Sequence, residues 1–185
     1  MLTAVFLATV IGISDGDTLT VLKPNRQQVK IRLAGIEAPE RRQPFGMLSK
    51  QSLSDLCFGA EAEVRPQAKD RYRRVVAQVK CDGIDANAAQ VYGGMAWVYR
   101  KYAKDQSLYI LQHDAWIERR GLWSDPSPIP PWEFRNYRRK DVRTFEQDET
   151  RWYYARGWAP EQSTAGIGGE MVGRTAIDLG SGLIN

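Results

Sequence analysis

The chain has 185 residues, 43% of them hydrophobic, which is enough for one ordinary domain with further chain beyond it. Lysine and arginine outnumber aspartate and glutamate by 26 to 22, and the formal charge of +4 favours a polyanionic partner without requiring one. The single histidine, His113, excludes a Cys/His zinc site and lies in a helical stretch where we expect a surface or packing role. Any hydrolytic chemistry must therefore use carboxylates, arginines and a hard metal ion.

The first thirteen residues are apolar but lack the basic start of a signal peptide. They run without a break into a β-branched stretch, so we predict that most of them form the first strand. No segment approaches the length of a membrane span, and we expect none. The compartment stays open, with a secreted or periplasmic protein favoured.

Three strands are predicted at the start of the chain. Residues 6–22 read as two strands separated by the turn Ser14–Asp17, whose glycine is expected to permit the tight reversal. A second turn follows at 23–26, and residues 29–33 then alternate between apolar and basic side chains. The pattern indicates a three-stranded meander with one face in a core.

A helix, two strands and two further helices are predicted next. In chain order they are a helix over 44–58 ended by Gly59, strands over 61–64 and 72–81, and helices over 85–99, capped by Asp85, and 106–120, closed by Gly121. Five short strands with a helix after the third are typical of a small Greek-key barrel. We therefore predict an α+β fold, a five-stranded OB-fold barrel with about three helices. Such barrels commonly bind nucleic acids, although the fold alone does not establish function.

The composition changes after Trp123. A Pro-rich stretch over 125–131 leads into an aromatic and charged region over 132–158, and the chain ends in a Gly-rich stretch over 164–185. We divide the chain into one domain over 1–132 and an extension over 133–185. The Gly-rich end resembles a flexible tail, because it buries too little apolar surface to offset its ordering entropy.

The two cysteines, Cys57 and Cys81, lack zinc-finger spacing. One is expected at the end of a helix packed on the barrel and the other at the end of a strand, so we predict that the pair lies close enough to bridge if the protein is exported. They are either two buried thiols or one disulfide.

Five charged residues suit the hydrolysis of a phosphodiester. Such chemistry needs charge stabilisation on the non-bridging oxygens, an activated water and a metal or cationic clamp. Asp17 ends a tight turn, Arg32 lies on a strand, and Arg74 lies near the start of a later strand. Glu37 and Glu40 follow Arg32 on a loop. Each of them alone has an ordinary reading as a turn or a solvated face.

In order and spacing, three linked motifs resemble the staphylococcal nuclease family. They are Ser14–Thr18 (SDGDT), Ile31–Glu40 (IRLAGIEAPE) and Asp70–Arg74 (DRYRR). The segment Gly121–Ser124 (GLWS) fits the same pattern, and the resemblance covers residues 6–132. It implies a calcium-dependent nuclease that hydrolyses DNA or RNA with a 5′-oxygen leaving group and so produces 3′-phosphate ends.

The resemblance also implies roles for individual residues. Asp17 and Glu37 would bind Ca²⁺ through their carboxylates and Ala38 through its backbone carbonyl, which are the hard oxygen ligands that calcium prefers. Glu40 would be the general base or would orient the attacking water. Arg32 and Arg74 would grip the phosphate with bidentate donors.

Four more residues are expected at the edges of this site. Asp15 would shape the surroundings of the metal without necessarily touching it. Arg71, Tyr72 and Tyr102 would meet the substrate, since an aromatic face stacks on any base; the two tyrosines read equally well as core or rim aromatics. The expected substrate is single-stranded or locally melted DNA or RNA, bound by a monomer.

The chain departs from the family pattern at two positions. Glu37 stands where aspartate is common, which puts the choice of metal in doubt, and Arg73 replaces the glycine common before the second arginine. Two other readings stay open. One is an inactive OB-fold module that binds nucleic acid or protein, and the other is an accessory protein whose aromatic tail docks a partner.

Overall fold

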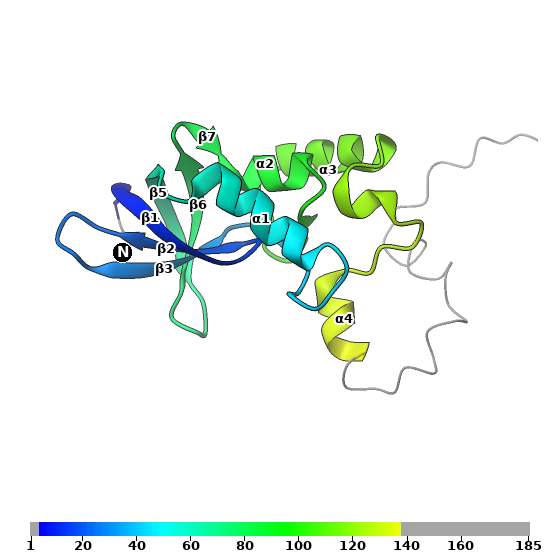
Figure 1. Cartoon of the computed structure of the whole chain (residues 1–185), viewed down its shortest axis with the longest axis horizontal. Helices are drawn as coiled ribbons and strands as arrows, with labels where there is room; N and C mark the ends of the chain where they lie inside the picture. Colours follow the sequence, from blue (N-terminus) through cyan, green and yellow to red (C-terminus); the bar gives the residue numbers. More distant parts are fainter. Residues whose placement is uncertain (1–3, 138–185) are drawn as a thin grey trace, which may run out of the picture. The chain divides into compact units, whose positions relative to one another are not determined.

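A closed β-barrel forms the centre of the computed structural model, which describes residues 4–137 (Figure 1). One sheet has the strand order β3-β2-β1-β5-β6-β7, and β3 also pairs with β6, so that five strands close into a barrel with β7 outside it. Its strands are β1 (Phe6–Asp15), β2 (Thr18–Leu22), β3 (Gln28–Leu33), β5 (Glu61–Lys69), β6 (Val75–Cys81) and β7 (Ile84–Asp85). This topology confirms the predicted five-stranded barrel of the OB type.

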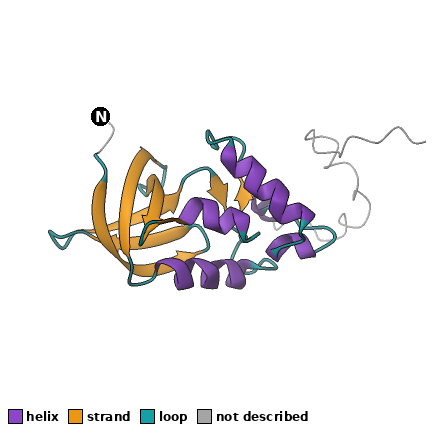
Figure 2. Cartoon of the chain, turned by 90° about the horizontal axis from the view of Figure 1, so that it is seen from above, coloured by secondary structure: helices purple, strands orange, loops and turns teal. Residues whose placement is uncertain are grey.

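Within residues 4–137, four α-helices lie beside the barrel. The barrel strands lie on one side of this folded region and most of the helices on the other (Figure 2). They are α1 (Gly46–Cys57), α2 (Ala86–Tyr92), α3 (Ser107–Ile117) and α4 (Pro131–Tyr137), and a short 3₁₀ helix, η1, spans Gly121–Ser124. The first three correspond in order to the predicted helices, with α2 shorter than expected, and α4 is an additional helix. None of the helices within residues 4–137 is both long and apolar enough to cross a membrane.

The second helix is shorter than the sequence predicts. Asp85 caps α2 as expected, accepting a bond from the Ala88 amide, but the helix ends at Tyr92 rather than Tyr99. Gly94 has φ +66°, and a side chain there would collide with the Arg120 carbonyl, so the chain turns between these segments. Beyond the turn, β8 (Trp97–Val98) pairs with β4 (Ile36–Glu37) in a separate two-stranded sheet.

The last strand of the barrel begins later than predicted, at Val75 rather than Tyr72. Asp70 causes this, because its Oδ1 accepts the amides of both Tyr72 and Arg74 and folds the segment into a turn. The preceding strand, β5, is longer than predicted and reaches Lys69. A bulge after Pro66 accommodates the proline within the ladder.

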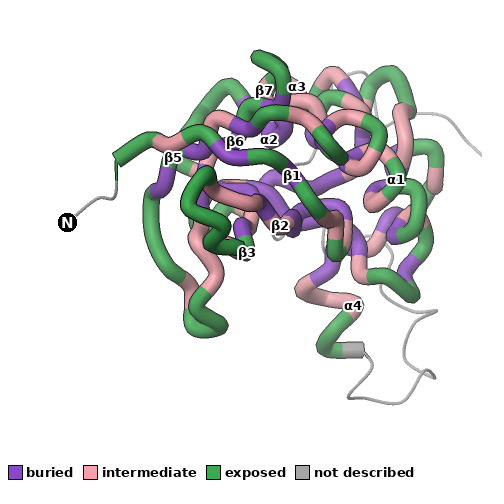
Figure 3. Tube along the Cα trace, turned by 60° about the vertical axis from the view of Figure 1, so that its left-hand side comes forward, coloured by how far each residue is buried: buried purple, intermediate pink, exposed green. Residues whose placement is uncertain are grey.

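The core fills the barrel and the gap between the barrel and the helices. In Figure 3 buried residues run along the central strands, and exposed residues lie in the turns, on the helices and at alternating positions of β1 and β5. The fully buried side chains of the strands are mainly β-branched or small, as the alternating pattern predicted. Across strands and helices together, the largest fully buried apolar side chains are Leu19, Ile31, Leu33, Ile36, Leu53, Val10, Val21, Val64, Val79 and Val91.

A disulfide joins Cys57 at the end of α1 to Cys81 at the end of β6. It resolves the alternative left open by the sequence in favour of the bridge. Both cysteines are completely buried, so the bond attaches α1 to the barrel from within the core.

Replacing both cysteines with alanine is expected to lower the free energy of unfolding by about 3 kcal/mol, because the bridge restricts a loop of 24 residues in the unfolded chain. Alanine avoids burying a hydroxyl group without a partner. Guanidinium unfolding without reductant measures the difference, and the parent protein in reductant should show a similar loss. Unchanged stability, or two alkylatable thiols in protein from an oxidising compartment, would contradict the expectation.

The extension predicted after residue 132 begins inside α4. The Gly-rich end over 164–185 lies outside the described residues.

Candidate active site

The tight turn after β1 places Asp15 and Asp17 on either side of Gly16. The glycine is required by space rather than by an unusual φ, because a Cβ there would collide with the Ser49 side chain of α1 and approach the Ala38 side chain. The side-chain Nε2 of Gln90 donates to the Gly16 carbonyl at 2.6 Å. The turn is therefore held from two sides, and both carboxylates start from a fixed backbone.

Asp17 is 3% exposed and is the centre of a hydrogen-bonded cluster. The β2–β3 register pairs Thr18 with Arg32, and Arg32 Nη1 reaches Asp17 Oδ2 at 3.1 Å. The Thr18 hydroxyl donates to Asp17 Oδ1 at 2.8 Å, and the Ala38 amide donates to Asp17 Oδ2 at 3.1 Å. A buried carboxylate is stable only with such partners.

Glu37 is the second buried carboxylate, at 4% exposed. Its backbone is fixed by pairing with Trp97 in the β4–β8 ladder. Its Oε1 lies 2.6 Å from Arg135 Nη2 and 3.7 Å from Arg32 Nη2, whereas the buried Oε2 has no hydrogen-bond partner among the described residues. Burial raises the pKa of Glu37 above its ordinary value, and the bond from Arg135 opposes that rise.

Asp15 lies close behind Asp17 and accepts the Asp17 amide at 3.2 Å. Burial, followed by the repulsion of the Asp17 carboxylate, raises the pKa of Asp15 to about 6. This is the behaviour of a crowded acidic site, in which a nearby cation would favour the charged forms.

Glu40 lies at the solvent edge of the cluster, with 41% of its side chain exposed. Arg135 Nη1 contacts Glu40 Oε1 at 2.6 Å, so one guanidinium joins Glu37 and Glu40. The backbone of the loop is fixed by Gln43, whose side-chain oxygen accepts the Glu40 amide and whose side-chain nitrogen donates to the Ile129 carbonyl.

Arg74 approaches the same cluster from the start of β6. The parallel β3–β6 pairing aligns Ile31 with Val75, which brings the residue before Val75 next to the strand that carries Arg32. Asp70 holds the Arg74 Nε at 2.7 Å, and Arg74 Nη1 donates to the Thr18 hydroxyl at 3.3 Å. A continuous chain of contacts therefore runs from Arg74 through Thr18 and Asp17 to Arg32.

The turn before β6 presents the other predicted substrate residues. Tyr72 is 64% exposed, with the guanidiniums of Arg71 and Arg74 at 4.8 and 5.6 Å from its ring centre. Arg73 has φ +66°, so it takes the left-handed conformation that a glycine would adopt at less cost. The turn is therefore kept despite the substitution.

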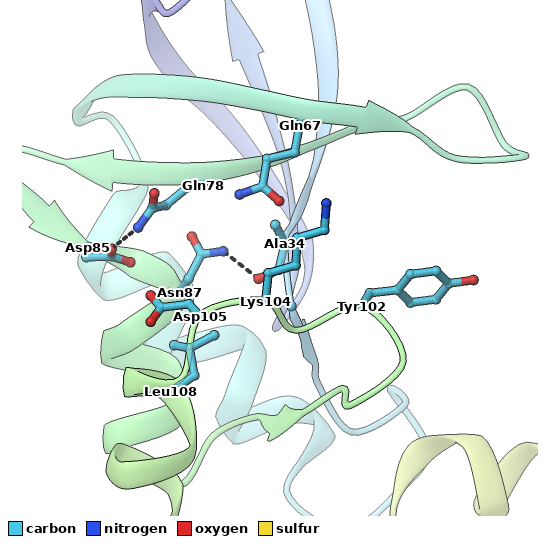
Figure 4. Close-up of a pocket in the computed structure, with 10 residues that line it drawn as sticks. Ala34, Gln67, Gln78, Asp85, Asn87, Tyr102, Lys104, Asp105 and Leu108 are labelled. Atoms are coloured by element: carbon cyan, nitrogen blue, oxygen red, sulfur yellow. Dashed lines mark hydrogen bonds between the residues drawn. The ribbon is translucent and has the colours of Figure 1, made fainter. Parts of the chain in front are cut away.

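Tyr102 lies elsewhere, at the mouth of a 280 Å³ cavity between the barrel and the start of α3. It is 58% exposed, and Figure 4 shows its ring directed away from the other lining side chains. Within the cavity, Gln78 bonds Asp85 and Asn87 bonds the Ala34 carbonyl. Tyr102 is thus an exposed rim aromatic that the structure does not bring into the acidic cluster.

Asp17, Glu37 and the Ala38 carbonyl are the residues available to a hard cation. Across residues 4–137, no group of three or more His, Cys, Asp or Glu side chains is arranged to hold a metal, so this donor set is limited to two carboxylates and one carbonyl. The buried Glu37 Oε2 without a hydrogen-bond partner and the raised pKa values of Asp15 and Glu37 fit a cation at this place. Water would complete the coordination.

The sequence motifs assign no role to two residues of the cluster, Thr18 and Arg135. Thr18 was part of a recognised motif but received no role, although it joins Asp17 to Arg74. Arg135 lies beyond the recognised motifs, in a helix that was not predicted, and no local pattern marks it. His113 is exposed on α3 beside Trp116, as expected.

Comparison with known proteins matches residues 30–125 to the family model described as staphylococcal nuclease homologue. An uncharacterized endonuclease of Escherichia coli is 41% identical over 128 residues, covering 69% of this chain and 83% of that protein. A micrococcal nuclease of Shigella flexneri is 43% identical over 141 residues, covering 70% and 80%, and an uncharacterized endonuclease of Haemophilus influenzae is 42% identical over 126 residues, covering 68% and 71%. The matched region contains Arg32, Glu37, Glu40 and Arg74, and the chain belongs to the staphylococcal nuclease homologue family.

Proposed function

We propose that this protein is a calcium-dependent nuclease that hydrolyses phosphodiester bonds in DNA, RNA or both. The observation that carries the proposal is the connected cluster in which Asp17, Glu37 and Arg32 meet and to which Thr18 joins Arg74. Family membership and the nuclease names of its relatives support the same activity.

The residues divide the chemistry among them. Arg32 and Arg74 donate to the non-bridging phosphate oxygens, and their bonds strengthen as negative charge builds in the transition state. Glu40, at the solvent edge, accepts a proton from the attacking water. The water oxygen bonds to phosphorus as the bond from phosphorus to the 5′-oxygen breaks. The 5′-oxygen takes up a proton from solvent and leaves as a hydroxyl, and the other product carries a 3′-phosphate.

Asp17, Glu37 and the Ala38 carbonyl would hold the calcium ion. When bound, calcium supplies positive charge that offsets the phosphate and the carboxylates around it. Glu37 reaches one methylene further than aspartate would, and its Oε2 is the buried oxygen that a cation would satisfy.

We expect cleavage of single-stranded DNA to require calcium and to be weak in magnesium, because two carboxylates and one carbonyl suit a larger, irregularly coordinated ion. The test compares single-stranded DNA, duplex DNA and RNA in calcium, in magnesium and in chelator, with analysis of the product ends. Glu37→Gln should raise the calcium concentration needed for half-maximal activity, whereas Glu61→Gln on the exposed face of β5 should not. Full activity in magnesium with calcium excluded contradicts the metal assignment.

The alternative is a module that binds nucleic acid without cutting it. A pure binder has no physical need for carboxylates beside its phosphate clamp, because they repel the ligand unless a cation intervenes. The cluster of Asp17, Glu37 and Glu40 around Arg32 and Arg135 therefore favours the enzyme. Binding without any cleavage in calcium would favour the module.

A further inference from the structure

The helix α4 brings a third arginine to the candidate site. The two terminal nitrogens of Arg135 contact different carboxylates, with Nη2 at 2.6 Å from Glu37 Oε1 and Nη1 at 2.6 Å from Glu40 Oε1. Charge-assisted bonds of this kind are about twice as strong as neutral ones. One guanidinium therefore links a buried carboxylate to the more exposed carboxylate that is the proposed base.

The position of Arg135 is fixed by anchors on α4 and on the segment before it. Trp132 stacks on Tyr99 with ring centres 5.3 Å apart and meets Trp97 edge-on at 6.0 Å. Trp132 and Arg135 are three residues apart, so they share a face of the helix. Just before α4, the Ile129 carbonyl accepts a bond from Gln43, which also fixes the loop of Glu40. Figure 1 shows α4 beside this loop.

Among residues 4–137, the charges of the carboxylates and guanidiniums in the cluster do not balance. Arg74 is neutralised by Asp70, outside the cluster. In this described part of the chain, the ion pairs of the four acidic side chains are made with two guanidiniums, so this set of six residues carries two negative charges in excess. The residues are Asp15, Asp17, Glu37 and Glu40 on one side and Arg32 and Arg135 on the other. A divalent cation would complete the balance, and until it binds Arg135 supplies half of the positive charge present.

We propose that Arg135 is a counter-ion built into the site: it holds Glu37 and Glu40 together before a cation binds, and it competes with the cation for them. This inference rests on the proposed function, because it takes calcium as the cation. A positive charge beside the cation weakens cation binding by Coulomb repulsion, while the same charge attracts a phosphate. Loss of the Arg135 charge therefore has opposite effects on the two ligands.

Calorimetric titration with calcium alone, in the absence of nucleic acid, tests the competition. Arg135→Gln is expected to bind calcium about fivefold to tenfold more tightly than the parent, as removal of one nearby charge predicts. Arg135→Lys keeps the charge and should stay close to the parent, and Arg65→Gln, an exposed arginine on β5, should have no effect. With single-stranded DNA in saturating calcium, Arg135→Gln should show a higher KM. An increase in affinity could not come from damage to the structure, which would only weaken binding. Equal or weaker calcium binding by Arg135→Gln overturns the proposal.

Thermal unfolding in chelator tests the counter-ion role without calcium. Arg135→Gln should lower Tm by about 2–4 °C in the parent, and this loss should disappear when Glu37 and Glu40 are both glutamine. An equal loss in both backgrounds overturns the role. If calcium does not bind the parent, the proposed calcium dependence fails and the competition fails with it. The unfolding comparison then decides whether Arg135 is the counter-ion.

Discussion

Replacing Glu40 with glutamine is expected to lower the turnover of single-stranded DNA by about 10²–10⁴-fold, the contribution typical of a positioned general base. Glutamine keeps the shape of the side chain but removes its negative charge and its ability to accept a proton. It removes no phosphate-binding cation, so binding of DNA should be retained or slightly tighter. Single-turnover cleavage and a separate binding measurement in calcium distinguish the two effects.

Glu63→Gln is the matched control for this experiment. Glu63 lies on β5, where it pairs with Arg65 at the surface, so its replacement should change neither rate nor binding. If Glu40→Gln cuts as fast as the parent, Glu40 is not the base. If the parent binds DNA but does not cut it in calcium, the binding module is the correct reading.

Arg74→Ala is expected to lower turnover by about 10²–10³-fold, the loss seen when a preorganised donor to the transition state is removed. The Arg74 side chain is held by Asp70 and by the Thr18 hydroxyl, so it waits in place rather than being ordered by substrate. Binding of DNA should weaken less than the rate, because the donors gain most of their strength in the transition state. The ratio of kcat to KM effects measures this difference.

The neighbouring Arg73 provides the control, since it is exposed, basic and in the same turn. Arg73→Ala should leave the rate close to that of the parent, and a loss as large as that of Arg74→Ala would mean that charge in the turn matters rather than the position of one guanidinium. Arg32→Ala should also slow cleavage. It is a less clean test, because it leaves the buried carboxylates of Asp17 and Glu37 without one of their cations.

The barrel was predictable because much of its strand sequence alternates between apolar and polar side chains. Residues 29–33 place apolar side chains inward at every second position, and that rule depends only on the local chain. The ends of elements were less predictable, because tertiary contacts decide them. Just beyond the end of the second helix at Tyr92, Gly94 has φ +66° and no room for a side chain against the Arg120 carbonyl, a contact between segments far apart in the sequence.

The same division applies to the candidate site. The motifs identified Asp17, Arg32, Glu37 and Ala38, and the structure brings these four together. Arg135 could not be found in this way, since its approach depends on the packing of Trp132 against Tyr99. The sequence correctly predicts Gly16 in a turn, on the ground that glycine permits a tight reversal. The structure shows that glycine is needed there because a side chain would collide with Ser49.

The parallel pairing of β3 with β6 also has a consequence for folding kinetics. Strand residues 31–33 and 75–77 meet across a long intervening chain, and such contacts form late because the loop between them must first be closed. Arg32 lies on β3 and Arg74 directly precedes β6, so the two side chains approach the same cluster only when the barrel closes. During refolding, a chain that has formed its local hairpins and helices would still hold Arg32 and Arg74, the proposed phosphate-binding pair, apart. Nuclease activity would therefore return only with the last, slowest contacts.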